Sequence, residues 1–249
     1  MSGHSKWHSI RHKKGAADAK RGKLFSRLSK EISVCARDGG GDIKVNNRLR
    51  TVVQAARTAN MPADNIERAI KKGTGELPGV TYEELLYEGY GPVGVAVMVR
   101  VLTDNKNRAA AEIRHIFDKR GGNLAGPGAV AWMFEQKGLI TVDKEKIAEE
   151  SLFNLALEAG AEDFKSEADV FEIYAGVAEF EEVKTALEDA GIECSEAEIT
   201  QIPTTEVKVE EADAGKVLAL INALEDHEDV QNVYANFDIP DEVLEALED

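Results

Sequence analysis

The fold is decided by one stretch, residues 139–202, which reads LITVDKEKIAEESLFNLALEAGAEDFKSEADVFEIYAGVAEFEEVKTALEDAGIECSEAEITQI. Short runs rich in β-branched and aromatic residues predict strands, and longer runs with apolar residues three and four positions apart predict helices. The predicted elements are strand 139–142, helix 144–159, strand 163–165, strand 169–174, helix 178–190 and strand 196–202. This β-α-β-β-α-β order is the ferredoxin-like arrangement, and it is complete within residues 137–203.

The sequence on either side of this stretch holds two incomplete units. The predicted elements are strand 93–102, helix 105–120 and strand 129–134 before it, and strand 206–209, helix 212–224 and strand 230–237 after it. Neither unit has enough elements to enclose a core of its own, but together they have. We therefore predict a discontinuous α+β domain, residues 79–136 plus 204–249, into which the ferredoxin-like domain of residues 137–203 is inserted.

The N-terminal third has a helical pattern. Apolar residues recur every three or four positions between Leu24 and Cys35 and form a stripe on one predicted helix. Glycines at 39–41 end this helix, and two further helices are predicted over 46–59 and 62–73. Residues 1–78 are therefore predicted to be a basic arm followed by a helical bundle. The fold class is multidomain α and α+β, with the N-terminal helical bundle followed by two α+β domains.

The charges are distributed unevenly along the chain. The net charge is −16, but residues 1–72 carry 17 Lys and Arg against 6 Asp and Glu, a net +11. Residues 73–249 carry 13 against 40, a net −27. A polyanion is attracted to one end of such a molecule and repelled by the rest. The charge distribution therefore predicts that residues 1–72 bind nucleic acid, either DNA or ribosomal RNA.

The candidate nucleic-acid-binding residues are cations of the arm and of one face of the first helix, with one aromatic residue. They are Lys6, Trp7, Arg11, Lys13, Lys14, Lys20, Lys23, Arg27 and Lys30. Cations that share a face neutralise phosphates and release their counterions, and Trp7 offers a ring on which an unpaired base can stack. The alternative is a solvated helix face, which is what most charge runs are. The connection from Asp38 to Val45 is longer than a helix-turn-helix turn, which disfavours major-groove reading by that motif.

The sequence gives little support for a metal site or for catalysis. His4, His8 and His12 have a spacing that three zinc ligands on a helix would have, but cations surround them and no carboxylate is near to orient a ring. We expect these histidines to contact nucleic acid, and we predict no metal and no cofactor. The chain contains none of the usual hydrolase motifs, so we predict that it is not an enzyme. Two distant cysteines suit a reducing cytoplasm, and the longest apolar run is too short to span a membrane.

Residues 104–108, DNKNR, lie where a predicted strand is followed by a helix. Asp104 or Asn105 can cap that helix, whereas Arg108 in its first turn can help to bind an anion. The cap is the favoured interpretation because caps are found at most helix starts.

Six short segments carry a family resemblance. In chain order they are GHSKW (3–7), AKRGK (19–23), GGGD (39–42), YEGYGP (87–92), DNKNR (104–108) and GGNL (121–124). Together they resemble the YebC/PmpR family over the whole chain. The resemblance implies a helical bundle and two α+β domains, with the ferredoxin-like domain inserted into the other. It also implies a probable transcriptional regulator that binds DNA. The mitochondrial relatives are translational activators, so the alternative is a ribosome- and rRNA-associated translation factor that relieves stalling, for example at proline runs.

Overall fold

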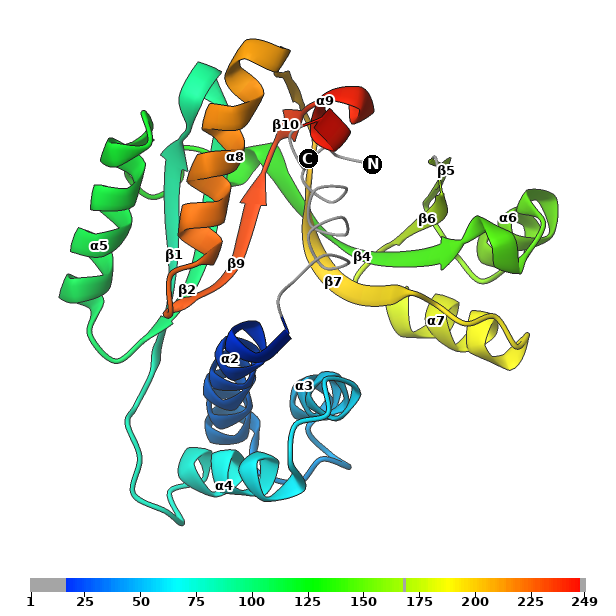
Figure 1. Cartoon of the computed structure of the whole chain (residues 1–249). Coiled ribbons are helices and arrows are strands. Elements are labelled where there is room, and N and C mark those ends of the chain that lie inside the picture. Colours follow the sequence, from blue (N-terminus) through cyan, green and yellow to red (C-terminus); the bar gives the residue numbers. More distant parts are fainter. Residues whose placement is uncertain (1–16, 168, 247–249) are drawn as a thin grey trace.

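The N-terminal part of the structure is a bundle of three helices (Figure 1). The computed structural model describes residues 17–167 and 169–246. The bundle helices are α2 (Ala17–Gly39), α3 (Asn47–Thr58) and α4 (Ala63–Gly73). Helix α3 begins where it does because Asn46 Oδ1 accepts the N–H of Leu49 at 3.0 Å. The Asn46 amide also donates to the carbonyls of Cys35 and Gly40, at 2.8 Å each, and so fixes the glycine-rich connection.

The bundle core follows the predicted apolar stripe, with one exception. Leu24 is 40% exposed and does not belong to the core. The buried residues of the core are Leu28, Ile32, Cys35, Ala36, Leu49, Val52, Val53, Ala56, Met61, Ile66 and Ala69.

The next unit is an antiparallel sheet with two helices on one face. Its strands are β1 (Glu83–Tyr90), β2 (Ala96–Thr103), β3 (Asn123–Leu124) and β9 (Val230–Ala235), in the order β3-β1-β2-β9. Helices α5 (Lys106–Lys119) and α8 (Glu211–Glu225) share a core with β2, whose Val97, Val99 and Val101 point toward them. The hydrophobic sides of these elements are thereby removed from water.

Three details of this unit differ from the sequence predictions. Strand β1 was not predicted, and β2 begins at Ala96 because Pro92–Gly94 forms a short 3-10 turn in which Val93 has φ 54°. The predicted strand 129–134 is wrong, since Ala131–Met133 is also a 3-10 turn. The reason is the buried Glu88 carboxylate, whose two oxygens accept backbone N–H groups of three residues in this segment, so these donors are not available to a β-ladder.

A second antiparallel sheet contains the strands predicted between residues 139 and 202. They are β4 (Phe134–Asp143), β5 (Asp163–Ser166), β6 (Val170–Ala175) and β7 (Glu196–Pro203), in the order β5-β6-β4-β7. Helices α6 (Glu149–Glu158) and α7 (Phe180–Asp189) share its core. Both β4 and α6 differ from prediction at their N-terminal ends: β4 begins five residues earlier, and Lys144–Lys146 forms a 3-10 turn before α6.

The chain then forms a separate two-stranded sheet and also supplies β9 to the first sheet. Strand β8 (Val207–Lys208) pairs in parallel with β10 (Phe237–Asp238), and α9 (Asp241–Ala246) packs against α8. The described fold is therefore mixed, with helices, two four-stranded antiparallel sheets and one two-stranded parallel sheet. In the part of the chain that the structure describes, the helices are too short or too polar to cross a membrane.

Candidate nucleic-acid interface

The structure describes some of the predicted nucleic-acid-binding residues. Lys6, Trp7, Arg11, Lys13 and Lys14 lie outside the described residues, as do His4, His8 and His12. Lys20 belongs to α2, but its side chain is likewise outside the described part. The candidates with described side chains are Lys23, Arg27 and Lys30.

These three cations contact an acidic turn that is distant in sequence. The acidic turn is residues 225–229, EDHED, which lead from α8 to β9. Lys23 Nζ lies 3.1 Å from Asp226 Oδ1, and the Arg27 guanidinium donates to the Glu225 carbonyl. Lys30 Nζ lies 2.6 Å from Asp229 Oδ1 and donates to the Glu228 carbonyl at 3.1 Å. The predicted cationic face of α2 therefore binds anionic and carbonyl oxygens within the same molecule.

Asp229 is the centre of this contact. Its side chain is 3% exposed, and Oδ2 accepts Thr103 Oγ1 at 2.9 Å and Arg108 Nη2 at 3.1 Å, in addition to Lys30 on Oδ1. Burial alone would raise the pKa of Asp229, but the hydrogen bonds from Lys30, Thr103 and Arg108 outweigh burial and lower it. One carboxylate thus connects α2, β2 and α5.

The DNKNR segment, residues 104–108, takes part in this contact with Asp229. Asn105 caps α5, because its Oδ1 accepts the N–H of Arg108 at 3.1 Å, so the favoured interpretation of this segment is confirmed. Arg108 also binds Asp104 Oδ1 at 2.9 Å. The anion that Arg108 meets in the structure is therefore a pair of carboxylates of its own chain.

A second charged network joins the bundle to the first sheet. Arg100 on β2 binds Glu31 of α2 at 3.0 Å and Glu84 of β1 at 2.5 Å, and Asn232 accepts a further hydrogen bond from Arg100 at 3.1 Å. Arg48 of α3 binds the other oxygen of Glu84 at 3.1 Å. Burial acts to lower the pKa of Arg100, but Glu31 and Glu84 outweigh burial and raise it. The bundle is thus held to the sheet by two separate sets of ion pairs.

Helix α3 also carries cationic residues that face solvent, although the sequence did not predict a site there. Arg50, Gln54 and Arg57 are exposed and form one stripe at i, i+4 and i+7. Arg50 donates to Asn47 Oδ1 at 2.7 Å and to the Lys44 carbonyl at 3.5 Å, and both acceptors are neutral. Among the described residues, no carboxylate forms an ion pair with Arg50 or Arg57. The sequence contained the signal, because α3 has five exposed basic or amide side chains and no acidic residue.

Comparison with known proteins identifies the chain. A sequence model described as "TACO1/YebC protein N-terminal domain" matches residues 5–76, and one described as "TACO1/YebC second and third domain" matches residues 82–237. The chain belongs to the TACO1/YebC family.

Similar proteins span the full length of this family member. It is 58% identical over 247 residues to a probable transcriptional regulatory protein of Desulforapulum autotrophicum, covering 99% of this chain and 100% of that one. A probable transcriptional regulatory protein of Natranaerobius thermophilus is 60% identical over 249 residues, with 99% and 100% coverage. The crystal structure of a conserved hypothetical protein from Aquifex aeolicus is similar in fold, with a TM-score of 0.84, 51% identity, and coverage of 93% of this chain and 96% of that one.

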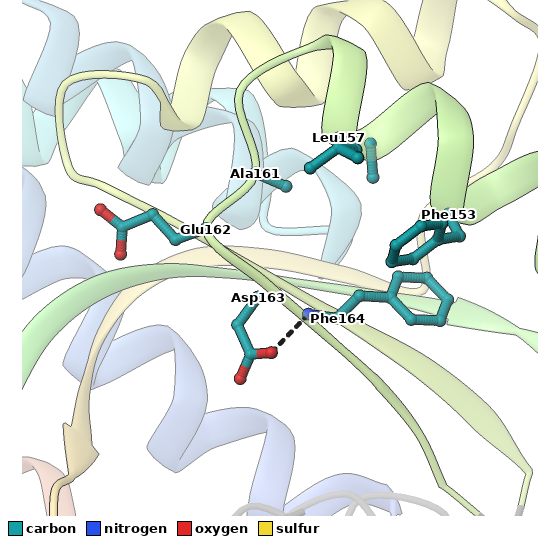
Figure 2. Close-up of a pocket in the computed structure, with 7 residues that line it drawn as sticks. Phe153, Leu157, Ala161, Glu162, Asp163 and Phe164 are labelled. Carbon is teal, nitrogen blue, oxygen red and sulfur yellow. Dashed lines mark hydrogen bonds between the residues drawn. The ribbon is translucent and has the colours of Figure 1, made fainter.

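Elsewhere in this TACO1/YebC chain, a shallow hollow of about 200 Å³ lies between α6 and β5 (Figure 2). The rings of Phe153 and Phe164 meet there edge to face, with centroids 5.5 Å apart. The carboxylates of Glu162 and Asp163 point away from these rings in Figure 2. The hollow is therefore an apolar surface feature without converging acid and base groups.

Neither histidines nor cysteines form a reactive cluster within the described ranges. There, no group of three His, Cys, Asp or Glu is arranged to hold a metal ion. His227 lies 2.9 Å from Glu112 through Nε2, and its Nδ1 accepts the N–H of Asp229 at 3.2 Å. Burial raises the pKa of the Cys35 thiol to about 11, so this side chain behaves as a core residue.

Proposed function

We propose that this protein is a non-catalytic regulator of gene expression that binds nucleic acid through residues 1–72. The observation that carries the proposal is the arrangement of Lys23, Arg27 and Lys30 on one face of α2, where they already bind a row of carboxylate and carbonyl oxygens. A face that holds such a row has the spacing and the charge to hold phosphate oxygens. The net +11 of residues 1–72 against −27 for the rest directs a polyanion to this end.

The predicted site remains part of the proposal. Phosphates are bound by the arm and by α2, and Trp7 stacks on an unpaired base where the target has one. The residues are Lys6, Trp7, Arg11, Lys13, Lys14, Lys20, Lys23, Arg27 and Lys30. The cations of the arm act first, because Lys23, Arg27 and Lys30 must leave the acidic turn before they can bind phosphates.

The relatives favour transcription as the regulated step. Those from Desulforapulum autotrophicum and Natranaerobius thermophilus are each named a probable transcriptional regulatory protein. This name supports a DNA target, whereas the resemblance to mitochondrial translational activators supports the alternative, a factor that acts on ribosomal RNA.

We also infer that the chain has the predicted division into residues 1–78, 79–136 plus 204–249, and 137–203. Strand pairing supports it, because β4, β5, β6 and β7 pair only with one another among the described strands, in the order β5-β6-β4-β7. That order and the β-α-β-β-α-β sequence of elements match the ferredoxin-like arrangement.

The experiment is a comparison of two targets with the full chain. Binding of a fluorescently labelled duplex DNA is measured at several salt concentrations, and co-sedimentation with purified ribosomes is measured in the same buffers. The variant carries Glu at Lys6, Arg11, Lys13 and Lys14, all of which precede α2 in the sequence. We expect the wild type to bind with a strong salt dependence and the variant to lose most of that affinity. Wild-type protein that binds neither target, or a variant that binds like the wild type, would refute the proposal.

A further inference from the structure

The connection between α3 and α4 differs from the long connection between α2 and α3. Only Ala59, Asn60, Met61 and Pro62 lie between the two helices. Asn60 has φ 60°, in the left-handed region that asparagine tolerates better than most residues. A turn of three or four residues between two steeply crossed helices is typical of a helix-turn-helix motif. In Figure 1, α3 is seen end on whereas α4 lies across the view, so the two helices cross steeply.

The turn is rigid because it is packed and hydrogen bonded. Met61 is 5% exposed, and its N–H donates to the Ala56 carbonyl at 2.9 Å. The N–H of Asn60 donates to the Arg57 carbonyl at 2.9 Å. Helix α2 packs against both α3 and α4, and Ser33 Oγ on α2 donates to the Ala69 carbonyl at 2.9 Å. A third helix that supports the other two is what allows a helix-turn-helix to present a fixed surface.

The outer surface of this unit is basic and polar. Residues 44–72 contain seven Lys and Arg but only two acidic residues, Asp64 and Glu67. Glu67 is neutralised by Lys71, whose Nζ lies 2.5 Å away. The exposed residues of the first turns of α4 include Asp64, Asn65 and Arg68. Asparagine pairs with adenine, arginine with guanine and aspartate with cytosine at base edges in the major groove.

The exposed stripe of α3 has the chemistry of a backbone contact. Arg50 and Arg57 are seven residues apart, which places them about 10 Å apart along the helix axis, so each can bind a separate phosphate. Gln54 lies between them and supplies a neutral donor of the kind that contacts phosphate oxygens, whereas the Thr51 hydroxyl beside them donates to the Asn47 carbonyl at 3.2 Å. The N-terminus of α4 has no side-chain cap, and so its first N–H groups can also face a phosphate.

Resting on the proposed nucleic-acid function, we propose that α3, the turn 59–62 and α4 form a helix-turn-helix unit that binds duplex DNA. The first turns of α4 enter the major groove, and Arg50 and Arg57 bind the phosphate backbone beside it. The major groove of B-DNA is about 12 Å wide and admits a helix, whereas that of an RNA duplex is deep and narrow and does not. This surface differs from the cationic face of α2, which the acidic turn covers.

The first test uses full-length R50E/R57E protein and a labelled duplex DNA of random sequence. The matched control is R114E/K119E, which reverses two exposed cations of α5 and makes the same change in net charge. We expect R50E/R57E to lose roughly tenfold or more in affinity, and the slope of log K against log salt to decrease by about 2. The control binds like the wild type. R50Q/R57Q, which removes the charges without reversing them, loses affinity in the same direction, and circular dichroism melting shows that each variant is folded.

The second test concerns base reading. N65A and R68A are compared with the wild type in selection from a pool of randomised duplexes, where we expect a relaxed preference at single base positions. Three outcomes separate the two proposals. Wild-type protein that binds neither duplex DNA nor folded RNA refutes the proposed function. If the wild type binds duplex DNA but R50E/R57E and R50Q/R57Q bind it equally well, only the helix-turn-helix proposal is overturned. Binding of folded RNA without duplex DNA also overturns it.

Discussion

Asp229→Asn tests how the bundle is held to the remainder of the chain. In the wild type, one carboxylate with a 3% exposed side chain accepts hydrogen bonds from Lys30, Thr103 and Arg108. The substitution keeps the shape but removes the charge, and its amide nitrogen is a donor that faces other donors. Lys30, whose side chain is 15% exposed, then has only neutral acceptors, the Glu228 carbonyl and, in one orientation of the new amide, its oxygen.

The expected loss of stability follows from this burial. Removing one partner of a buried ion pair costs about 3–5 kcal/mol, because the other charge stays buried without compensation. Arg108 is 40% exposed and keeps its contact with Asp104, which places the expected cost near the lower end, at about 3 kcal/mol. Urea unfolding followed by circular dichroism measures the cost. In a Lys30→Met background the same substitution should cost about 1–2 kcal/mol less, because the donor that most needs the carboxylate is absent.

The same substitution has a predictable pH dependence. The pKa of Asp229 is lower in the folded protein than the ordinary value of 3.8, so the unfolded chain binds this proton more readily. The stabilisation is therefore fully present above pH 3.8 and is lost as the pH falls toward the folded value. The difference in stability between wild type and Asp229→Asn should be constant near neutrality and shrink below about pH 4. A difference that is negligible at neutral pH, or that is unchanged in the Lys30→Met background, would refute this account of the contact.

Further predictions concern single contacts. Glu88→Gln should lower the free energy of unfolding in urea by about 1–3 kcal/mol, because an NH2 group replaces an oxygen that accepts backbone N–H groups. Gly73→Ala should cost about 1–3 kcal/mol in the same assay, since a Cβ there would lie 2.3 Å from the Ser33 carbonyl oxygen. Gly22→Ala, with nothing within 4 Å of its Cβ, should instead stabilise α2 by about 1 kcal/mol, and equal effects of the two alanines would contradict the packing argument. Asp226→Asn should raise the affinity for duplex DNA in titrations, with little change in melting temperature because Asp226 is 65% exposed, and unchanged affinity would show that the acidic turn does not compete with phosphates.

The sequence predicted the elements whose periodicity is strong and missed those shaped by distant contacts. The strands and helices between Leu139 and Ile202 follow clear periods, and all of them are present with shifted ends. Strand β1 was missed because its alternation is broken by Glu88, a buried charge in a position that a sequence pattern treats as exposed. The turn at 131–133 was predicted as a strand for the same reason, since the Glu88 carboxylate that holds the turn lies about forty residues earlier in the chain.

Prediction of the binding residues from the sequence was limited in the same way. Helical geometry correctly grouped Lys23, Arg27 and Lys30 on one face, but their partners lie in residues 225–229, about two hundred residues later. No local pattern identifies such a pairing. The exposed arginines of α3 were easier to predict from the sequence than the partners of the α2 cations. A helix without acidic residues cannot neutralise its own cations.

If the bundle binds nucleic acid as proposed, its two basic surfaces make different contributions to the salt dependence of binding. Lys23 and Lys30 are already paired with carboxylates, so moving them to phosphates exposes Asp226 and Asp229, which then attract cations from solution. The nucleic acid releases counterions when it binds these lysines, but the exposed carboxylates take counterions up. The two effects offset each other, so these lysines add little to the slope of log K against log salt. Arg50 and Arg57 have no such carboxylate among the described residues, so each phosphate they bind adds about 0.9 to the slope. On this proposal the wild-type slope counts mainly the contacts made by the arm and by α3. In Asp226→Asn the slope should steepen, because Lys23 can then move to a phosphate without exposing the Asp226 carboxylate to cations.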